Sequence, residues 1–125
     1  MLPSSATTVS EIQGRTTWNG VYDTGTSGSA LGSTLVVDTP SLSGNAREFD
    51  FQYTSNGGER FYDSFGTDRT ATHFLYDVEV YVKSPNTDVA NIEMDMNETM
   101  SNGDTVIFGF QCDGWNGTWD YTENS

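Results

Sequence analysis

The sequence predicts an all-β protein, an antiparallel two-sheet sandwich of the jelly-roll type. Short segments rich in Val, Phe, Tyr, Ile and Thr are separated by clusters of Gly and Asn, which is typical of strands joined by turns. Apolar and polar side chains alternate along several of these segments, as in strands with one buried face, and helical periodicity is nearly absent. We expect a single domain over residues 1–125, with a flexible N-terminal segment over residues 1–12.

Three strands are expected in the first half of the chain. A loop rich in Gly, Ser and Thr over Thr24 to Ala30 precedes a first core strand, Leu31 to Val37. Arg47 to Tyr53 alternates strictly, with its aromatic side chains on one face and its acidic and amide side chains on the other. The turn Ser55-Asn56-Gly57-Gly58 predicts a hairpin, because Asn-Gly readily adopts positive φ angles. Arg60 to Phe65 is then the returning strand.

The second half contains the longest regular segment, Thr72 to Lys83, which ends before Pro85 because proline cannot donate to a ladder. Ala90 to Asn97 and Thr105 to Asp113 follow as further strands, joined by a turn at Ser101-Asn102-Gly103. A weak last strand at Trp119 brings the expected number to about seven. No apolar closing strand follows it.

Composition limits the partners that this chain can bind. Eighteen acidic residues against five basic ones give a formal net charge of -13, which argues against nucleic acid and against anionic membranes. No apolar run reaches the roughly 18 residues of a membrane-spanning helix. The first residues lack the features of a signal peptide, so we expect any such peptide to have been removed. Low lysine content with much Thr, Ser, Asn and Gly predicts a secreted, extracellular protein.

The strand from Ala90 to Asn97 is the strongest functional clue. Its alternation places Ile92, Met94 and Met96 toward a core, and Asn91, Glu93, Asp95 and Asn97 on the other face. Two carboxylates and two amides in one row are one way to build a groove that binds sugars. An ordinary solvated sheet face has the same pattern.

The segment from Phe74 to Tyr121 resembles secreted bacterial concanavalin A-like jelly-roll domains, which include lectins and glucanases. The resemblance rests on four stretches, which together cover somewhat under half of the chain: Phe74-Leu75-Tyr76-Asp77-Val78-Glu79-Val80-Tyr81-Val82, the Glu93 strand, Phe108-Gly109-Phe110-Gln111-Cys112 and Trp119-Asp120-Tyr121. It implies a two-sheet sandwich whose concave face binds or cleaves polysaccharide. Such domains are longer and continue beyond a Trp-Asp-x segment with further strands and a second cysteine. The resemblance therefore implies a partial domain, completed by a missing C-terminal half or by another chain.

Glucanase-like members of that group have a Glu-x-Asp-x-Glu strand, in which the outer glutamates are nucleophile and acid/base. The resemblance implies that Glu93 is the nucleophile and Asp95 its helper, but Asn97 stands where the acid/base belongs. A retaining glycosidase needs a proton-donating carboxylic acid, and an amide cannot replace it. Asp77 or Glu79 on a neighbouring strand could substitute, as could Glu98 through a β-bulge. Whether the chain is an enzyme stays open, and an endo-acting glycoside hydrolase with this degenerate site is one alternative.

Binding needs only the polar groups and the aromatic rings, so we expect a polysaccharide-binding module. Glu79, Asn97 and Gln111 offer donors and acceptors for sugar hydroxyls, and aromatic rings stack on the apolar faces of sugars. The best-placed aromatic residues are Tyr81, Tyr121 and the tryptophans Trp18, Trp115 and Trp119. The alternative for each tryptophan is a plug at one end of the sandwich.

No cofactor is expected apart from the alternative of calcium, bound by oxygen ligands in Asp63 to Asp68 or Asp113 to Asn116. His73 is the only histidine, which excludes a multi-histidine metal site within one chain and predicts a surface residue beside a strand start. Cys112, the only cysteine, is either a buried thiol or a half-cystine with a partner outside the chain. Exposed strand edges in a half-sandwich would template pairing with another chain. A self-associating structural module is therefore the third functional alternative.

Overall fold

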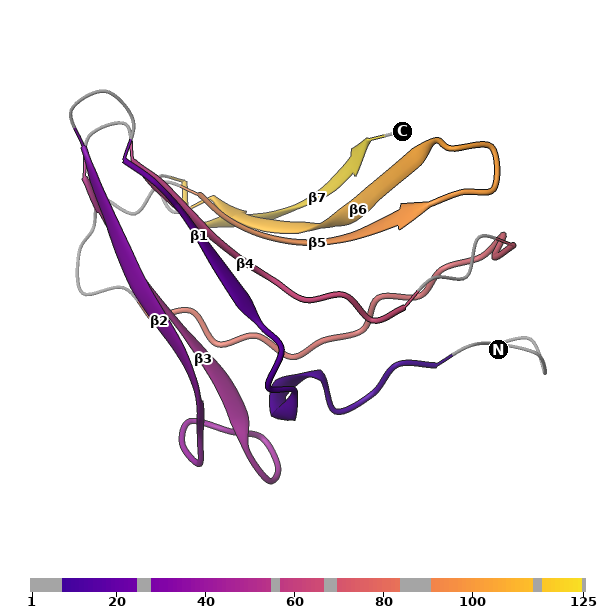
Figure 1. Ribbon diagram of the computed structural model, residues 1–125. Coiled ribbons are helices and arrows are strands. Elements are labelled where there is room, and N and C mark those ends of the chain that lie inside the picture. Colours follow the sequence, from indigo (N-terminus) through magenta and orange to yellow (C-terminus); the bar gives the residue numbers. More distant parts are fainter. Residues whose placement is uncertain are drawn as a thin grey trace. The chain divides into compact units, whose positions relative to one another are not determined.

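The computed structural model describes residues 8–24, 28–54, 57–66, 70–83, 91–113 and 116–124 (Figure 1). Over these residues the protein is all-β, with antiparallel sheets of two or three strands, none of them closed into a barrel. The chain divides into two compact units, an N-terminal unit up to Phe65 and a C-terminal unit from Gly66 onward. No helix in the described ranges is long and apolar enough to cross a membrane. The all-β prediction is confirmed, whereas the jelly-roll topology stays a prediction.

The N-terminal unit consists of two antiparallel strand pairs that follow a short 3-10 turn. The turn is η1 (Ile12–Gly14). β1 (Asn19–Asp23) pairs with β4 (Gly58–Tyr62), and β2 (Ser29–Val37) pairs with β3 (Ala46–Thr54). Figure 1 shows the strands of each pair running side by side.

Aromatic rings join the two strand pairs of the N-terminal unit. The Phe61 ring of β4 lies 5.4 Å from the ring of Phe49 and 5.3 Å from that of Phe51, both on β3. Trp18, just before β1, lies 5.1 Å from Phe49 in an edge-on arrangement, and its Nε1 donates a hydrogen bond to the Ile12 carbonyl at 3.0 Å. Such ring pairs contribute about 0.5–1.5 kcal/mol each beyond the area they bury. The two strand pairs, β1–β4 and β2–β3, therefore contact each other through aromatic side chains and share no backbone ladder.

Because Gly32 on β2 has no side chain, Glu59 of the β1–β4 pair can lie against β2 at this position. A Cβ atom at this position would collide with the Asp50 carbonyl oxygen and with Glu59 Oε2. Glu59 Oε1 accepts a hydrogen bond from the Gln52 backbone N–H at 2.8 Å. Its Oε2 is enclosed and has no hydrogen-bond partner in the described part of the chain. A carboxylate from β4 is thus held against β2 and β3 with one oxygen unsatisfied.

Arg47 ties the segment before β1 to the β2–β3 pair. Its Nε donates to the Gln13 carbonyl at 2.8 Å and its Nη2 to the Arg15 carbonyl at 2.7 Å. Its Nη1 donates to Thr34 Oγ1 at 3.1 Å. One guanidinium therefore satisfies two backbone carbonyls that lie outside any strand. Backbone groups without a ladder partner need such side-chain partners when the segment is ordered.

Asp63 fixes the other end of the same segment. Its Oδ2 accepts hydrogen bonds from Arg15 Nε at 2.7 Å and from Thr17 Oγ1 at 2.8 Å, and the side chain is only 3% exposed. The hydrogen bond from Arg15 lowers the pKa of the Asp63 carboxyl below its ordinary value, despite the opposing effect of burial. Asp63 is therefore a structural carboxylate.

The C-terminal unit contains one antiparallel sheet of three strands in the order β5-β6-β7. The strands are β5 (Asn91–Thr99), β6 (Thr105–Asp113) and β7 (Thr118–Asn124). The predicted turn between the first two is confirmed: Gly103 has a positive φ of 94°, and its N–H donates to the Met100 carbonyl at 3.0 Å.

Several strand predictions are confirmed, in particular those for β2, β3, β5 and β6, of which β6 has the expected bounds. The described strands number seven, but they are a different set from the expected one. β1 was not expected, and Thr72 to Lys83 is not a strand. That segment forms no ladder with a described strand and instead contacts the sheet through rings, with Phe74 5.5 Å from Phe108 and Tyr76 5.7 Å from Phe110.

The predicted hairpin before β4 is wrong. Ser55 and Asn56 lie outside the described residues, and the Gly57 N–H donates to the Thr54 carbonyl at 3.0 Å. However, β4 pairs with β1 and not with β3. The reason is that Phe61 packs on the aromatic face of β3, which places the two strands face to face and not edge to edge.

Leu31 to Val37 is a strand but not a core strand. Leu31 is 58% exposed and Leu35 46% exposed, because the register places both on the face of β2 that they share with Gln52 and Glu48 of β3. None of the described residues is fully buried. Each unit is thus built on sheet faces that the described chain covers only in part.

Candidate functional site

The sheet of the C-terminal unit gathers five of its polar side chains on one face. The register pairs Glu93 of β5 with Gln111 of β6, and Gln111 in turn with Asp120 of β7, so these three form one row across all three strands. Asp95 and Asn97 lie on the same face, two and four residues along β5. We call this set the polar face: Glu93, Asp95, Asn97, Gln111 and Asp120. Four of its members are exposed and Gln111 is half-buried.

The strand alternation that predicts this face is confirmed. Ile92, Met94 and Met96 of β5 are half-buried, whereas the intervening Glu93 and Asp95 are exposed. The ladder between β5 and β6 runs without interruption from the pair Asn91 and Asp113 to the pair Thr99 and Thr105. No bulge interrupts the period of two, so each side chain keeps the face that its sequence position dictates.

Gly109 forms the centre of the polar face. It lies opposite Asp95 in the ladder, and a Cβ atom there would stand 2.7 Å from Asp95 Oδ1 and 2.8 Å from Asp95 Cα, and would also collide with the Met94 carbonyl oxygen. The Asp95 carboxylate therefore lies across the backbone of β6. Because Gly109 has no side chain, β5 and the Asp95 carboxylate can lie close against β6 at this point.

The charge on this face has a single sign. Glu93, Asp95 and Asp120 are carboxylates, and residues 84–125 contain no Lys, Arg or His while holding eight of the eighteen acidic residues. In the described part of the chain the one ion pair is Arg15 with Asp63, in the other unit. Glu93 and Asp120 take part in no ion pair among the described residues, and like charges on one face create a field that extends over the sheet.

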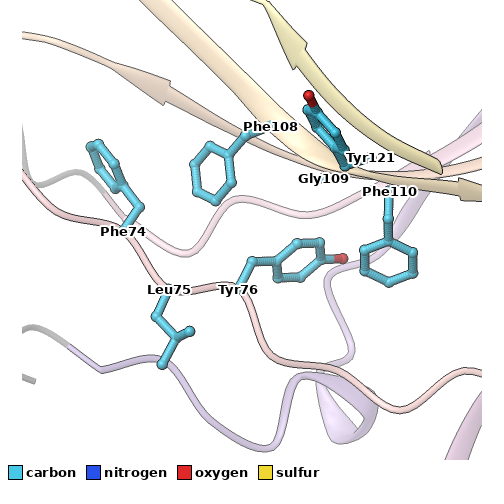
Figure 2. A pocket seen from close by; sticks show the side chains of 7 residues that line it. All are labelled: Phe74, Leu75, Tyr76, Phe108, Gly109, Phe110 and Tyr121. Carbon is cyan, nitrogen blue, oxygen red and sulfur yellow. The ribbon is translucent and has the colours of Figure 1, made fainter. Parts of the chain in front are cut away.

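The opposite face of the sheet is apolar and hollowed. An open pocket of about 280 Å³ is lined by Phe74, Leu75, Tyr76, Phe108, Gly109, Phe110 and Tyr121. Figure 2 shows the rings of Phe74 and Tyr76 approaching those of Phe108 and Phe110, whereas Leu75 points away from them. Burial, and secondarily the charge of Asp95, raises the pKa of the Tyr76 hydroxyl above its ordinary value. The hydroxyl is therefore held in its neutral form.

The structure separates most of the predicted aromatic contacts from the predicted polar ones. Trp119 pairs with Cys112 in the ladder, on the opposite face from Gln111, and its ring lies 5.9 Å from that of Phe110. Tyr81 is 71% exposed and belongs with Glu79 to the segment 70–83, which is not part of the ladder. Trp115 lies outside the described residues. Trp18 belongs to the aromatic cluster of the N-terminal unit, where its ring faces those of Phe49 and Phe65.

The carboxylates considered as a substitute acid are not on the polar face. Glu98 pairs with Val106 and is half-buried with an unpartnered Oε1, and without a bulge it stays on the apolar face. Asp77 and Glu79 are exposed on the segment 70–83. The carboxylate that completes the Glu93 row is Asp120, which the sequence analysis did not single out. The alternation Trp119-Asp120-Tyr121 would have indicated its face, but not its partner strand.

No group of three or more His, Cys, Asp or Glu side chains suited to a metal ion occurs among the described residues. In the first candidate calcium loop Asp63 is engaged by Arg15 and Thr17, and Thr67 and Asp68 lie outside the described ranges. Gly114 and Trp115 of the second loop do so as well. His73 is exposed and shares a hydrogen bond of 3.0 Å with Thr72 Oγ1. Cys112 is half-buried with a free thiol.

No protein-family model, curated protein or solved structure matches this chain. The fold and the site therefore define its class by themselves: an all-β protein of antiparallel sheets, one of which has a carboxylate-rich and amide-rich face.

Proposed function

We propose that this chain is a secreted carbohydrate-binding module of the concanavalin A-like kind, and that it binds polysaccharide on the polar face. The observation that supports the proposal is the row Glu93, Gln111 and Asp120, which the register aligns across three strands. Carboxylates and amides are planar groups that accept or donate hydrogen bonds in fixed directions, which suits the regularly spaced hydroxyls of a sugar chain.

Gln111 is the best single position at which to test binding. It stands at the centre of the row and is half-buried, so its amide is more fixed than the exposed side chains around it. Removing one or two neutral hydrogen bonds costs about 1 kcal/mol, or about fivefold to tenfold in the dissociation constant. Gln111→Ala should weaken binding to an insoluble or soluble polysaccharide by that factor in a depletion or affinity-electrophoresis assay.

A matched control is available in the N-terminal unit. Gln52 of β3 is also a strand glutamine with carboxylates beside it, but it belongs to the N-terminal unit. Gln52→Ala should leave polysaccharide binding unchanged. Failure of the wild-type protein to bind any polysaccharide, or equal loss in both variants, would contradict the proposal.

One observation also favours the alternative that the chain is an enzyme. Glu93 and Asp120 flank Gln111 on the two outer strands, so their backbones are roughly 10 Å apart at a strand spacing of about 4.8 Å. Inverting glycosidases separate their two carboxyl groups by about 6.5–9.5 Å to admit a water molecule. In this alternative the pair would be Glu93 and Asp120, not Glu93 and residue 97. Release of reducing sugar that Glu93→Gln and Asp120→Asn each abolish would replace the binding proposal with an inverting hydrolase.

A further inference from the structure

We infer that segment 72–83 is an interaction surface, and that its partner is the same segment of a second copy of this chain, paired with it as an antiparallel β-strand. Residues 71–83 contain no turn, bend or helix and belong to no ladder, and Figure 1 draws them as a trace without an arrow. No backbone hydrogen bond joins the segment to another of the described residues. An extended segment with unpaired backbone N–H and C=O groups is a template for another strand.

One side of the segment is already covered by the sheet of the same unit. The ring of Phe74 lies 5.5 Å from that of Phe108, and the ring of Tyr76 lies 5.7 Å from that of Phe110. Figure 2 shows these rings approaching one another. The segment therefore runs over β6 as a single strand of a second layer. Because this packing uses side chains, the backbone groups of the segment stay available for a ladder.

The alternation along the segment continues to its end. Val78 and Val82 are half-buried, whereas Asp77, Glu79 and Lys83 are exposed. Lys83 is the only lysine of the chain and forms no ion pair with a described residue. A partner strand that places a carboxylate opposite Lys83 therefore gains a cross-strand pair of opposite charges.

A second copy supplies that carboxylate when the two segments pair about a twofold axis at Val80. Antiparallel pairing in this register places Asp77 of each copy opposite Lys83 of the other, so the two ends of the ladder each hold a pair of opposite charges. On the side that faces the sheet, Val80 lies opposite Val80 and Val78 lies opposite Val82. Such pairs of β-branched side chains stabilise a ladder.

Charge distinguishes this register from the alternatives. A register centred on Val78 would place Asp77 opposite Glu79, and like charges directly opposite each other are destabilising. β5 and β7 also have free edges, but residues 84–125 contain no basic side chain. Pairing with either strand would bring the carboxylates of the segment beside further carboxylates. The Val80 register gives each Lys83 an acidic partner and puts no two carboxylates opposite each other.

Cross-linking at the twofold axis tests the register. Val80→Cys is combined with Cys112→Ser, so that the new thiol is the only one in the chain. Directly opposed Cβ atoms of an antiparallel pair lie about 4.5–5.5 Å apart, close to the separation that a disulfide spans. Mild oxidation should therefore produce a covalent dimer.

Val21→Cys in the same background is the matched control, because Val21 on β1 has the same exposed fraction as Val80, 37%. The Val80 variant should form the covalent dimer at least roughly fivefold faster, since pairing raises the effective concentration of one thiol beside the other. Equal rates for the two variants would overturn the inference.

Exchange of charges tests the same contact without a new thiol. Lys83→Asp replaces two attractive pairs in the dimer with two repulsive ones. The dissociation constant of the dimer, measured by sedimentation equilibrium at about 0.15 M salt, should therefore rise roughly tenfold. Arg60→Asp, at an exposed position of β4, changes the net charge equally and should raise the constant less than about threefold.

The double variant Asp77→Lys with Lys83→Asp restores both the charge pair and the net charge. Its dissociation constant should return to within about threefold of the wild-type value. Equal effects of Lys83→Asp and Arg60→Asp, or a double variant that does not recover, would overturn the pairing of Asp77 with Lys83. A wild-type chain that stays monomeric at all protein and salt concentrations would overturn the second copy as partner.

Discussion

Single carboxyl groups in this chain serve different purposes according to the donors around them. Asp63 is held by Arg15 and Thr17, whereas Glu59 has one satisfied oxygen and one enclosed, unsatisfied oxygen. An enclosed acceptor without a donor costs about 1–3 kcal/mol relative to a paired one. The two groups therefore lead to opposite expectations for neutralising substitutions.

Glu59→Gln should stabilise the N-terminal unit. The amide of the variant carries no charge, so enclosing its second polar atom without a partner costs less than enclosing the carboxylate Oε2. The other amide position can still accept from the Gln52 N–H. We expect an increase of about 1 kcal/mol in the free energy of unfolding by urea, against less than about 0.5 kcal/mol for exposed Glu48→Gln. A decrease in stability would show that the charge itself is needed.

Asp63→Asn should change how stability depends on pH. The hydrogen bond from Arg15 lowers the pKa of Asp63 in the folded state below the ordinary value of 3.8. The charged form is therefore favoured by folding, so its contribution is present above pH 3.8 and is lost as the pH falls through the lowered folded pKa. The variant should be less stable than the wild type near neutral pH, and the difference should shrink in acid. Thermal unfolding over a series of acidic pH values measures this, and a difference that is constant with pH would contradict it.

At the scale of the elements, the sequence predicts which face a side chain takes better than it predicts which strand lies beside it. Phe49 and Phe51 of β3 are half-buried as the alternation predicts, although Tyr53 is exposed, and Ile92 to Asn97 of β5 alternate between half-buried and exposed. The pairing of β4 with β1 does not follow from alternation. A strand with aromatic residues on one face can either pair edge to edge with β3 or pack face to face on it, and the sequence pattern is the same in both cases. Thr72 to Lys83 illustrates the same limit, since its apolar side chains contact a sheet through rings without a ladder.

The candidate site shows this limit at two positions. The β5 part of the polar face could be predicted, because period-two alternation alone assigns Glu93, Asp95 and Asn97 to one face. Asp120 and Gly109 could not, because their place depends on the register of three strands. Whether any of these residues binds a ligand stays a prediction.

Gly109→Ala should damage the sheet and the polar face together. The added methyl group would meet backbone atoms of Met94 and Asp95, so rotation of the Asp95 side chain alone cannot relieve the clash and the β5–β6 ladder must separate locally. Overpacking of this kind costs about 1–3 kcal/mol. Urea unfolding should register that loss, together with weaker polysaccharide binding. Gly58→Ala is a suitable control, because a Cβ at Gly58 has no neighbour within 4 Å, and a similar loss in both variants would contradict the steric explanation.

At the scale of the whole molecule, the feature that matters most is that no residue in the described ranges is classed as buried. Trp119 and Tyr121 of β7 are 53% and 81% exposed, and β5 and β7 each have one edge without a partner strand in the described sheet. Unpaired edges and apolar faces are the features that another chain can cover. The net charge of -13 opposes association of identical copies. We propose that self-association is therefore weak at low ionic strength and increases as salt screens this repulsion.

Light scattering after size exclusion tests this expectation. The mass should rise above the 13.7 kDa of one chain with protein concentration and with salt, and adding a reductant should not change it if Cys112 is a packed thiol rather than an intermolecular half-cystine. A strictly monomeric protein at all salt concentrations would remove the self-associating alternative. A dimer that dissociates when a reductant is added would show that Cys112 forms an intermolecular disulfide.

The aromatic cluster around Trp18 also gives the N-terminal unit an optical signature of its own. The Trp18 indole is half-buried, faces Phe49 and Phe65 edge-on, and donates its N–H to a fixed carbonyl, whereas Trp119 of the C-terminal unit is largely open to water. Water around an excited indole shifts its emission to longer wavelengths, so Trp18 and Trp119 should emit at different wavelengths in the folded chain. Variants that keep only Trp18 or only Trp119, with the other two tryptophans changed to Phe, would then report the unfolding of each unit separately within one intact protein.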